Sequence, residues 1–172
     1  DHNYVERIAQ YNDISSEYGW KQLRARYLAN ITLVDDMVGM IVDTLKEQGI
    51  YEETIIVFTS EHGEMAGDHG MLEKRSMYEE SARVPLLIRA PQISKEQKIV
   101  SGNFSHVDLV PTLLEMLGRE VPDGLDGKSI ASTLEGGGNL RNNEVFVEWN
   151  GIGSIEDRLL GTHEINTMHQ AP

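Results

Sequence analysis

Apolar residues recur at steps of three and four positions along the first third of the chain. They are Leu23, Tyr27, Ile31, Val34, Val38, Ile41 and Leu45. This period predicts one long amphipathic helix that begins near Trp20 and ends near Gly49, a residue suited to a helix C-terminus. Asp35 and Asp36 fall in the middle of the helix. Their spacing from the apolar stripe favours a solvated or locally paired position over a catalytic one.

Short continuous apolar runs follow the predicted helix. Residues 54–58 and 84–88 are too short for helices, and we expect both to be buried strands. Residues 145–149 predict one more strand, whereas residues 100–105 are either a strand or a connection. A further helix is predicted from Asp108 to Gly118, with Pro111 in its first turn, and a short one near 130–134. Helix and strand in alternation predict an α/β fold, with parallel strands as the default.

Polar residues with candidate chemistry follow the first predicted strand directly. They are Ser60, Glu61, His62 and Glu64. Ligand sites of open parallel sheets lie at the carboxyl ends of the strands. A carboxylate beside an imidazole can supply half of a divalent metal site. Lys74 follows after three glycines, and it could return over the same pocket as a positive charge for an anionic group.

Each of these residues also has a structural interpretation. The pair at 61–62 could be a solvated loop, and a lysine in a polar loop is usually solvated. Asp68 and His69 lie between two glycines and could simply form a turn. We interpret His106 as structural, because it directly precedes a predicted helix.

Composition narrows the classes of function. The chain has 172 residues, 40% of them hydrophobic, which is the size of one domain with a core. It has no cysteine, which excludes disulfides and thiol catalysis within it. The net charge of -13 argues against a nucleic-acid partner, and no apolar run approaches the length of a membrane span. An anionic substrate would therefore need local positive charge from a divalent ion and Lys74, with Arg75 or Arg83 as additional cations.

Several segments of the chain together carry a family resemblance. They are Phe58-Thr-Ser-Glu-His-Gly-Glu, Gly67-Asp-His-Gly, Lys74, Tyr78-Glu-Glu-Ser and Arg83-Val-Pro-Leu-Leu-Ile-Arg-Ala-Pro. This pattern resembles the second signature region of the type I sulfatases, within the alkaline-phosphatase superfamily. The resemblance extends from about Trp20 to about Trp149. It implies part of an alkaline-phosphatase-like, mainly parallel sheet flanked by helices, incomplete at both ends of this chain.

The resemblance also implies roles for individual residues. Glu61 and His62 correspond to metal ligands, and Lys74 corresponds to the lysine that contacts the sulfate ester during catalysis. The implied cofactor is a divalent metal, calcium first, with manganese or zinc as alternatives. Glu61 departs from the family pattern, which has aspartate at this position. The extra methylene changes how the carboxylate reaches an ion. The implied reaction is cleavage of a small sulfate ester by a formylglycine nucleophile.

The family's nucleophile motif, Cys/Ser-x-Pro-Ser-Arg, does not occur in this sequence. We therefore expect a fragment that is inactive alone and whose partner is the remaining part of its own polypeptide. We divide it into a lead-in at 1–19, an α/β core at 20–149, and a loop or the start of a carboxyl-terminal subdomain at 150–172. Two alternatives stay open: a phosphate or phosphonate monoester hydrolase of the same superfamily, and a non-catalytic acidic module, which Glu61 favours. The particular ester, the oligomeric state and the compartment are also open.

Overall fold

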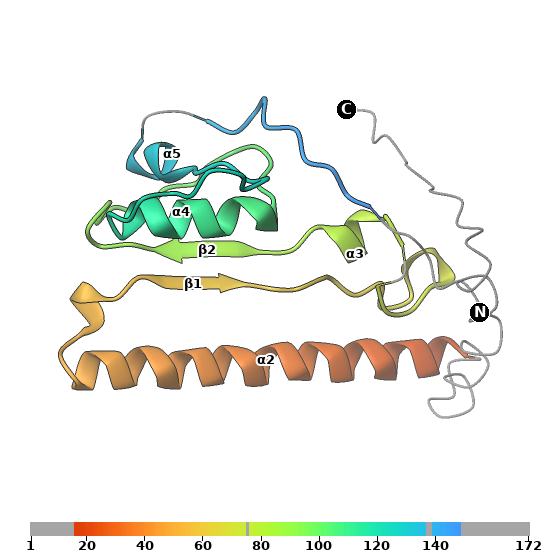
Figure 1. Cartoon of the computed structure of the whole chain (residues 1–172). Coiled ribbons are helices and arrows are strands. Elements are labelled where there is room, and N and C mark those ends of the chain that lie inside the picture. The colour runs from red at the N-terminus through yellow and green to blue at the C-terminus, as the bar shows by residue number, and fades with distance from the viewer. Residues whose placement is uncertain (1–15, 75, 137–138, 149–172) are drawn as a thin grey trace, which may run out of the picture. The chain divides into compact units, whose positions relative to one another are not determined.

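The structure is a computed structural model and describes residues 16–74, 76–136 and 139–148. The predicted lead-in up to residue 15 and the predicted segment 150–172 lie outside these ranges. The helices are α2 (Glu17–Glu47), α3 (Glu79–Ala82), α4 (Leu109–Met116) and α5 (Ala131–Glu135); the strands are β1 (Ile56–Thr59) and β2 (Leu86–Arg89); 3-10 turns lie at Tyr51–Glu53, Asp68–Gly70 and His106–Asp108 (Figure 1). The described residues group into two compact units, one of 16–51, 58–87 and 148, the other of 52–57 and 88–147.

Helix α2 confirms the long helix that the apolar period predicts. It begins at Glu17, earlier than expected, because the Ser16 hydroxyl accepts the N–H of Gly19 at 3.1 Å and caps the first turn. Its end follows the prediction: Gly49 has φ 72°, and the N–H groups of Gly49 and Ile50 bond back to carbonyls of the last turn. Within the described ranges, no helix is long and apolar enough to cross a lipid bilayer.

Strands β1 and β2 pair in a two-stranded sheet and run in opposite directions (Figure 1). Each lies one or two residues further along the chain than predicted. The parallel arrangement expected for consecutive strands is wrong for this pair. A parallel pair requires a crossover back to the starting edge, usually through a helix. Here the connection is irregular apart from the 3-10 turn at Asp68–Gly70 and the single turn of α3.

The hydrophobic cluster of the second unit lies around α4 and α5. Ala90, Met116 and Ala131 are buried there, and Ile88 and Leu134 are among the half-buried residues packed against them. The predicted helix after residue 108 is confirmed as α4, and the predicted helix near 130–134 is confirmed as α5. The strand predicted at 145–149 is wrong for its described part, because residues 145–148 pair with no strand within the described ranges. The undecided segment 100–105 is a connection with one isolated parallel bridge, between Gly102 and Leu140.

Asp108 joins α4 to the segment before α5. Its carboxylate accepts the N–H of Ser105 at 3.2 Å, which completes a capping box, and the N–H of Lys128 at 2.8 Å. Thr112, one turn later, is fully buried, and its hydroxyl accepts the N–H of Ile130 at 3.1 Å. These polar groups are satisfied inside the unit, so Asp108 supports the fold, although its side chain makes no capping hydrogen bond to the first turn of α4.

Candidate active-site loop

The candidate site lies in residues 60–85, here called the β1–β2 loop. His62 is the best-defined member of the site. Its Nδ1 lies 2.7 Å from the carbonyl oxygen of Gly63, which can only accept a hydrogen bond. Nδ1 therefore carries the proton, and in the neutral ring Nε2 keeps its lone pair. A hydrogen bond from one ring nitrogen to a backbone carbonyl is the usual way to fix the orientation of a metal-binding histidine.

Glu61 and His62 meet the distance requirement for a shared ion. Glu61 Oε2 lies 4.0 Å from His62 Nε2. Two donors bound to one ion at about 2.1 and 2.4 Å lie about 3 to 4.5 Å apart, depending on the angle between them. The Glu61 side chain is 92% exposed, so it can still adjust its position. Within the described ranges no cluster of three or more His, Asp or Glu side chains could hold a metal, so an ion held by these two residues would need further ligands.

Ser60 and Glu64, the other polar residues at the end of β1, support the loop instead. The Ser60 hydroxyl donates to the carbonyl of His62 at 2.7 Å. One carboxylate oxygen of Glu64 accepts two backbone N–H groups, from Ala66 at 3.1 Å and from Glu73 at 2.7 Å. Glu64 thereby joins the start of a ten-residue excursion to its end, directly before Lys74.

The excursion between Glu64 and Lys74 is a compact turn with unusual backbone angles. Ala66, His69 and Glu73 are non-glycine residues with φ between 46° and 66°. The N–H of Met65 donates to the carbonyl of Glu73 at 2.8 Å, and the Met65 side chain is fully buried. Left-handed conformations are costly for such residues, so the surrounding contacts must hold them. Asp68 and His69 form a 3-10 turn, which agrees with their structural interpretation.

Side chains outside the excursion hold its tip. The ring of His69 stacks on Tyr78 with centroids 3.9 Å apart, and its Nε2 lies 3.7 Å from a carboxylate oxygen of Glu80. From α2, Arg24 donates to the carbonyl of Ala66 at 2.9 Å and to the Asp68 carboxylate at 3.0 Å. Nothing in the sequence marks Arg24 for this contact, since a cation on the polar side of a helix carries no signal of a partner 44 residues away.

Lys74 lies on an exposed part of the loop, and the structure fixes its backbone close to that of Gly63. The link is Ser81, whose hydroxyl donates to the carbonyl of Lys74 at 2.6 Å and whose carbonyl accepts the N–H of Gly63 at 2.8 Å. Of the additional cations, Arg83 forms an exposed ion pair with Glu79 at 3.4 Å, and residue 75 lies outside the described ranges. The loop therefore links the segment that contains Glu61 and His62 to the segment that contains Lys74.

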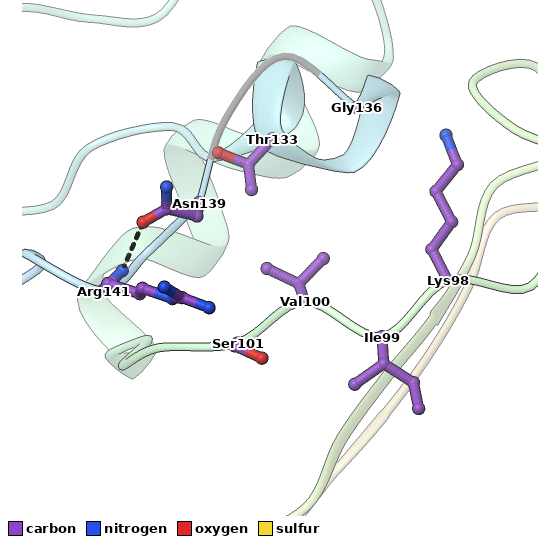
Figure 2. A pocket seen from close by; sticks show the side chains of 8 residues that line it. All are labelled: Lys98, Ile99, Val100, Ser101, Thr133, Gly136, Asn139 and Arg141. Atoms are coloured by element: carbon purple, nitrogen blue, oxygen red, sulfur yellow. Dashed lines mark hydrogen bonds between the residues drawn. The ribbon is translucent and has the colours of Figure 1, made fainter.

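A separate open cavity of about 620 Å³ lies in the second unit (Figure 2). It is lined by Lys98, Ile99, Val100, Ser101, Thr133, Gly136, Asn139 and Arg141. None of the predicted site residues lines it. The ammonium of Lys98 donates to the carbonyl of Glu135 at 3.2 Å, at the end of α5, so this cation already has a structural partner.

Comparison with known proteins connects this loop to a family. The sulfatase family model matches residues 1–119. N-acetylglucosamine-6-O-sulfatase of Bacteroides thetaiotaomicron is 39% identical over 144 residues, which are 80% of this chain and 26% of that protein. This chain thus spans about a quarter of the length of that curated relative.

Solved structures give the same result for the fold. A protein solved in complex with its substrate D-glucosamine-2-N,6-O-disulfate matches with a TM-score of 0.71 and 33% identity, over 90% of this chain and 33% of that chain. Phosphonate monoester hydrolase of Silicibacter pomeroyi matches with a TM-score of 0.71 and 32% identity, over 85% and 30% respectively. The alkaline-phosphatase-like α/β fold expected from the sequence is thereby confirmed. The chain belongs to the sulfatase family of the alkaline-phosphatase superfamily.

Proposed function

We propose that this chain supplies the metal- and substrate-binding loop of a sulfuric ester hydrolase. The observation that carries the proposal is the orientation of His62, whose Nδ1 is bonded to Gly63 so that Nε2 lies 4.0 Å from the Glu61 carboxylate. The name of the Bacteroides relative and the substrate in the solved complex support a sulfated amino sugar as the first ester to test.

The proposed roles follow from the chemistry of each group. His62 Nε2 and a Glu61 oxygen would hold a divalent ion, for which we propose calcium, with manganese or zinc as alternatives. When bound, such an ion polarises the oxygens of the ester. The ammonium of Lys74 would offset the charge that develops on the ester oxygens. The resemblance assigns the nucleophile, a formylglycine, to polypeptide outside residues 1–172, so we expect this chain to be inactive alone.

Metal affinity tests the proposal most directly. In the full-length protein, calorimetric titration with calcium should show that Glu61→Gln and His62→Ala each weaken binding by at least about tenfold, since even outer-shell partners of a metal site are worth that much. Glu61→Asp should bind calcium at least as well as the wild type, because it restores the residue found in the family. Ser76→Ala, in the same loop, is the control and should bind normally.

The metal titration also tests the non-catalytic alternative. That alternative predicts that the wild type binds calcium poorly and that Glu61→Asp restores tight binding. Unchanged affinity in both Glu61→Gln and His62→Ala would refute the proposed ligands. The exposed position of the Glu61 side chain supports its role as a metal ligand. An exposed carboxylate has room to change its rotamer and so to offset the methylene that glutamate has in excess of aspartate.

A phosphonate monoester hydrolase is the second candidate, because the enzyme from Silicibacter pomeroyi is as similar in structure as the protein solved with the glucosamine disulfate. A panel of N-acetylglucosamine-6-sulfate, an aryl sulfate, an aryl phosphate and an aryl phosphonate monoester separates the two. We expect the highest kcat/KM with a sulfate ester. A kcat/KM at least tenfold higher with the phosphonate would assign the second activity instead.

A further inference from the structure

We propose that Ser81 is a positioning residue that holds Lys74 in register with the metal-binding residues; this inference rests on the proposed function. Ser81 is 4% exposed, although its residue type is usually found at the surface. It bonds to both arms of the site at once, through its hydroxyl to Lys74 and through its carbonyl to Gly63. Ser81 is therefore a direct connection between the backbone next to His62 and the backbone that carries Lys74.

The Gly63 side of this junction has little freedom to move. A Cβ at Gly63 would overlap the carbonyl of Glu80, so the Gly63 backbone packs directly against the peptide that joins Glu80 to Ser81. Ser81 is itself fixed by the first turn of α3, where its N–H donates to the carbonyl of Tyr78 at 2.9 Å. The metal-binding arm is thus attached through backbone groups, which a side-chain substitution leaves in place.

At Lys74 the contact is made by the side chain of Ser81, through its hydroxyl. Lys74 follows Glu73, whose φ of 66° is costly for a residue with a Cβ, and its own side chain is exposed. The backbone at Lys74 sets the point from which its long side chain starts. The carbonyl of Lys74 accepts the Ser81 hydroxyl at 2.6 Å and the N–H of Ser76 at 2.8 Å. Loss of the Ser81 hydroxyl would leave the local bond from Ser76 in place but would detach this carbonyl from α3, and the position of the ammonium relative to the ion would change.

A double-mutant cycle in the full-length enzyme tests this role. Ser81→Ala should lower kcat/KM for the best sulfate ester by about tenfold to a hundredfold, the usual cost of misplacing a reacting group by about 1 Å. In a Lys74→Ala background, Ser81→Ala should lower kcat/KM by no more than about twofold, because the group it positions is already gone. Calcium affinity of Ser81→Ala should stay within about twofold of the wild type, since the Gly63 bond uses a backbone carbonyl.

Two controls separate positioning from a general structural role. Ser76→Ala removes another hydroxyl of the same loop, one that contacts the Met65 sulfur at 3.2 Å, and should keep wild-type kcat/KM. Melting temperatures report whether each variant folds. Should Ser81→Ala unfold the protein, Ser81→Cys takes its place, because a thiol has similar volume but is a weaker donor.

The outcomes distinguish failure of the inference from failure of the proposed function. Equal losses from Ser81→Ala in the wild-type and Lys74→Ala backgrounds, a loss of calcium affinity, or unchanged activity would each refute the positioning role while leaving the proposed function intact. Full activity of Lys74→Ala with Ser81 present would refute the proposed function of Lys74, and the positioning role with it.

Discussion

Glu64 is a carboxylate of the candidate site to which we assign a structural role and no catalytic one. Its Oε1 accepts the N–H groups of Ala66 and Glu73, at 3.1 and 2.7 Å. Both residues have left-handed backbone angles, with φ of 46° and 66°. Glu64 therefore bonds to two of the positions at which the loop is most strained. We expect Glu64→Ala to open the loop, whereas Glu64→Gln, which keeps an acceptor oxygen, should preserve it.

The magnitude follows from these contacts. A hydrogen bond to a charged group contributes about 1.5 to 3 kcal/mol, so two bonds contribute at most about 3 to 6 kcal/mol. Glu64 is only half-buried, and water can replace part of the loss, so we expect Glu64→Ala to cost about 1.5 to 3 kcal/mol. The left-handed backbone of Ala66 and Glu73 costs about 1 to 2 kcal/mol each, which is a similar sum. Removing the carboxylate should therefore make the closed loop about ten to a hundred times less populated relative to open forms.

Hydrogen exchange and kinetics in the full-length protein measure this effect. The amides of Ala66 and Glu73 should exchange about ten to a hundred times faster in Glu64→Ala and less than about fivefold faster in Glu64→Gln. We expect kcat/KM to fall in Glu64→Ala and to stay near wild type in Glu64→Gln. If Glu64→Gln loses as much activity as Glu64→Ala while its exchange rates stay normal, the negative charge itself serves the chemistry, and the structural assignment is wrong.

Two further predictions concern packing away from the proposed ligands. Gly67→Ala should destabilise the protein by about 1 to 3 kcal/mol in urea unfolding, because its Cβ would lie 2.6 Å from the ring of Trp20 and its φ is 97°; unchanged stability would show that α2 does not hold the loop tip. Asp108→Ala should cost about 2 to 4 kcal/mol, because it leaves the N–H groups of Ser105 and Lys128 without their acceptor. Asp108→Asn should cost about half as much, since one oxygen remains, and equal losses would contradict this account.

The sequence predicted best those elements whose signals are local. The apolar period predicted α2. Its end near Gly49 was also predictable, because termination at a glycine depends on a few adjacent residues. The start was displaced because Ser16 lies before the periodic positions begin. The strand predicted at 145–149 shows the opposite case. Its residues favour β-structure, but a strand also requires a partner, and in the structure Phe146 is 82% exposed. The direction of β2 relative to β1 was missed for the same reason, because pairing is a long-range property.

In the candidate site, too, the sequence predicted the proposed functional residues but not the residues that hold them in place. Glu61, His62 and Lys74 were identifiable because their chemistry and spacing resemble a family motif. Their supports were not, because hydrogen bonds from side chains to backbone across a loop with left-handed residues follow no period. Ser60 and Glu64 are polar like Glu61, and all three follow the same predicted strand, so the sequence alone does not separate their roles.

What separates these groups is the direction of their polar atoms. The oxygens of Ser60, Glu64 and Ser81 point inward and are used by the loop itself. The side chains of Glu61 and Lys74 are exposed. A backbone group that loses its hydrogen-bond partner inside the loop is costly, so we expect the supporting positions to tolerate few substitutions. An exposed charge stays solvated until a ligand arrives and costs the fold little. In a chain with a net charge of -13, this separation would leave Lys74 available for the anionic substrate that we propose, provided that the supporting residues keep its backbone in place.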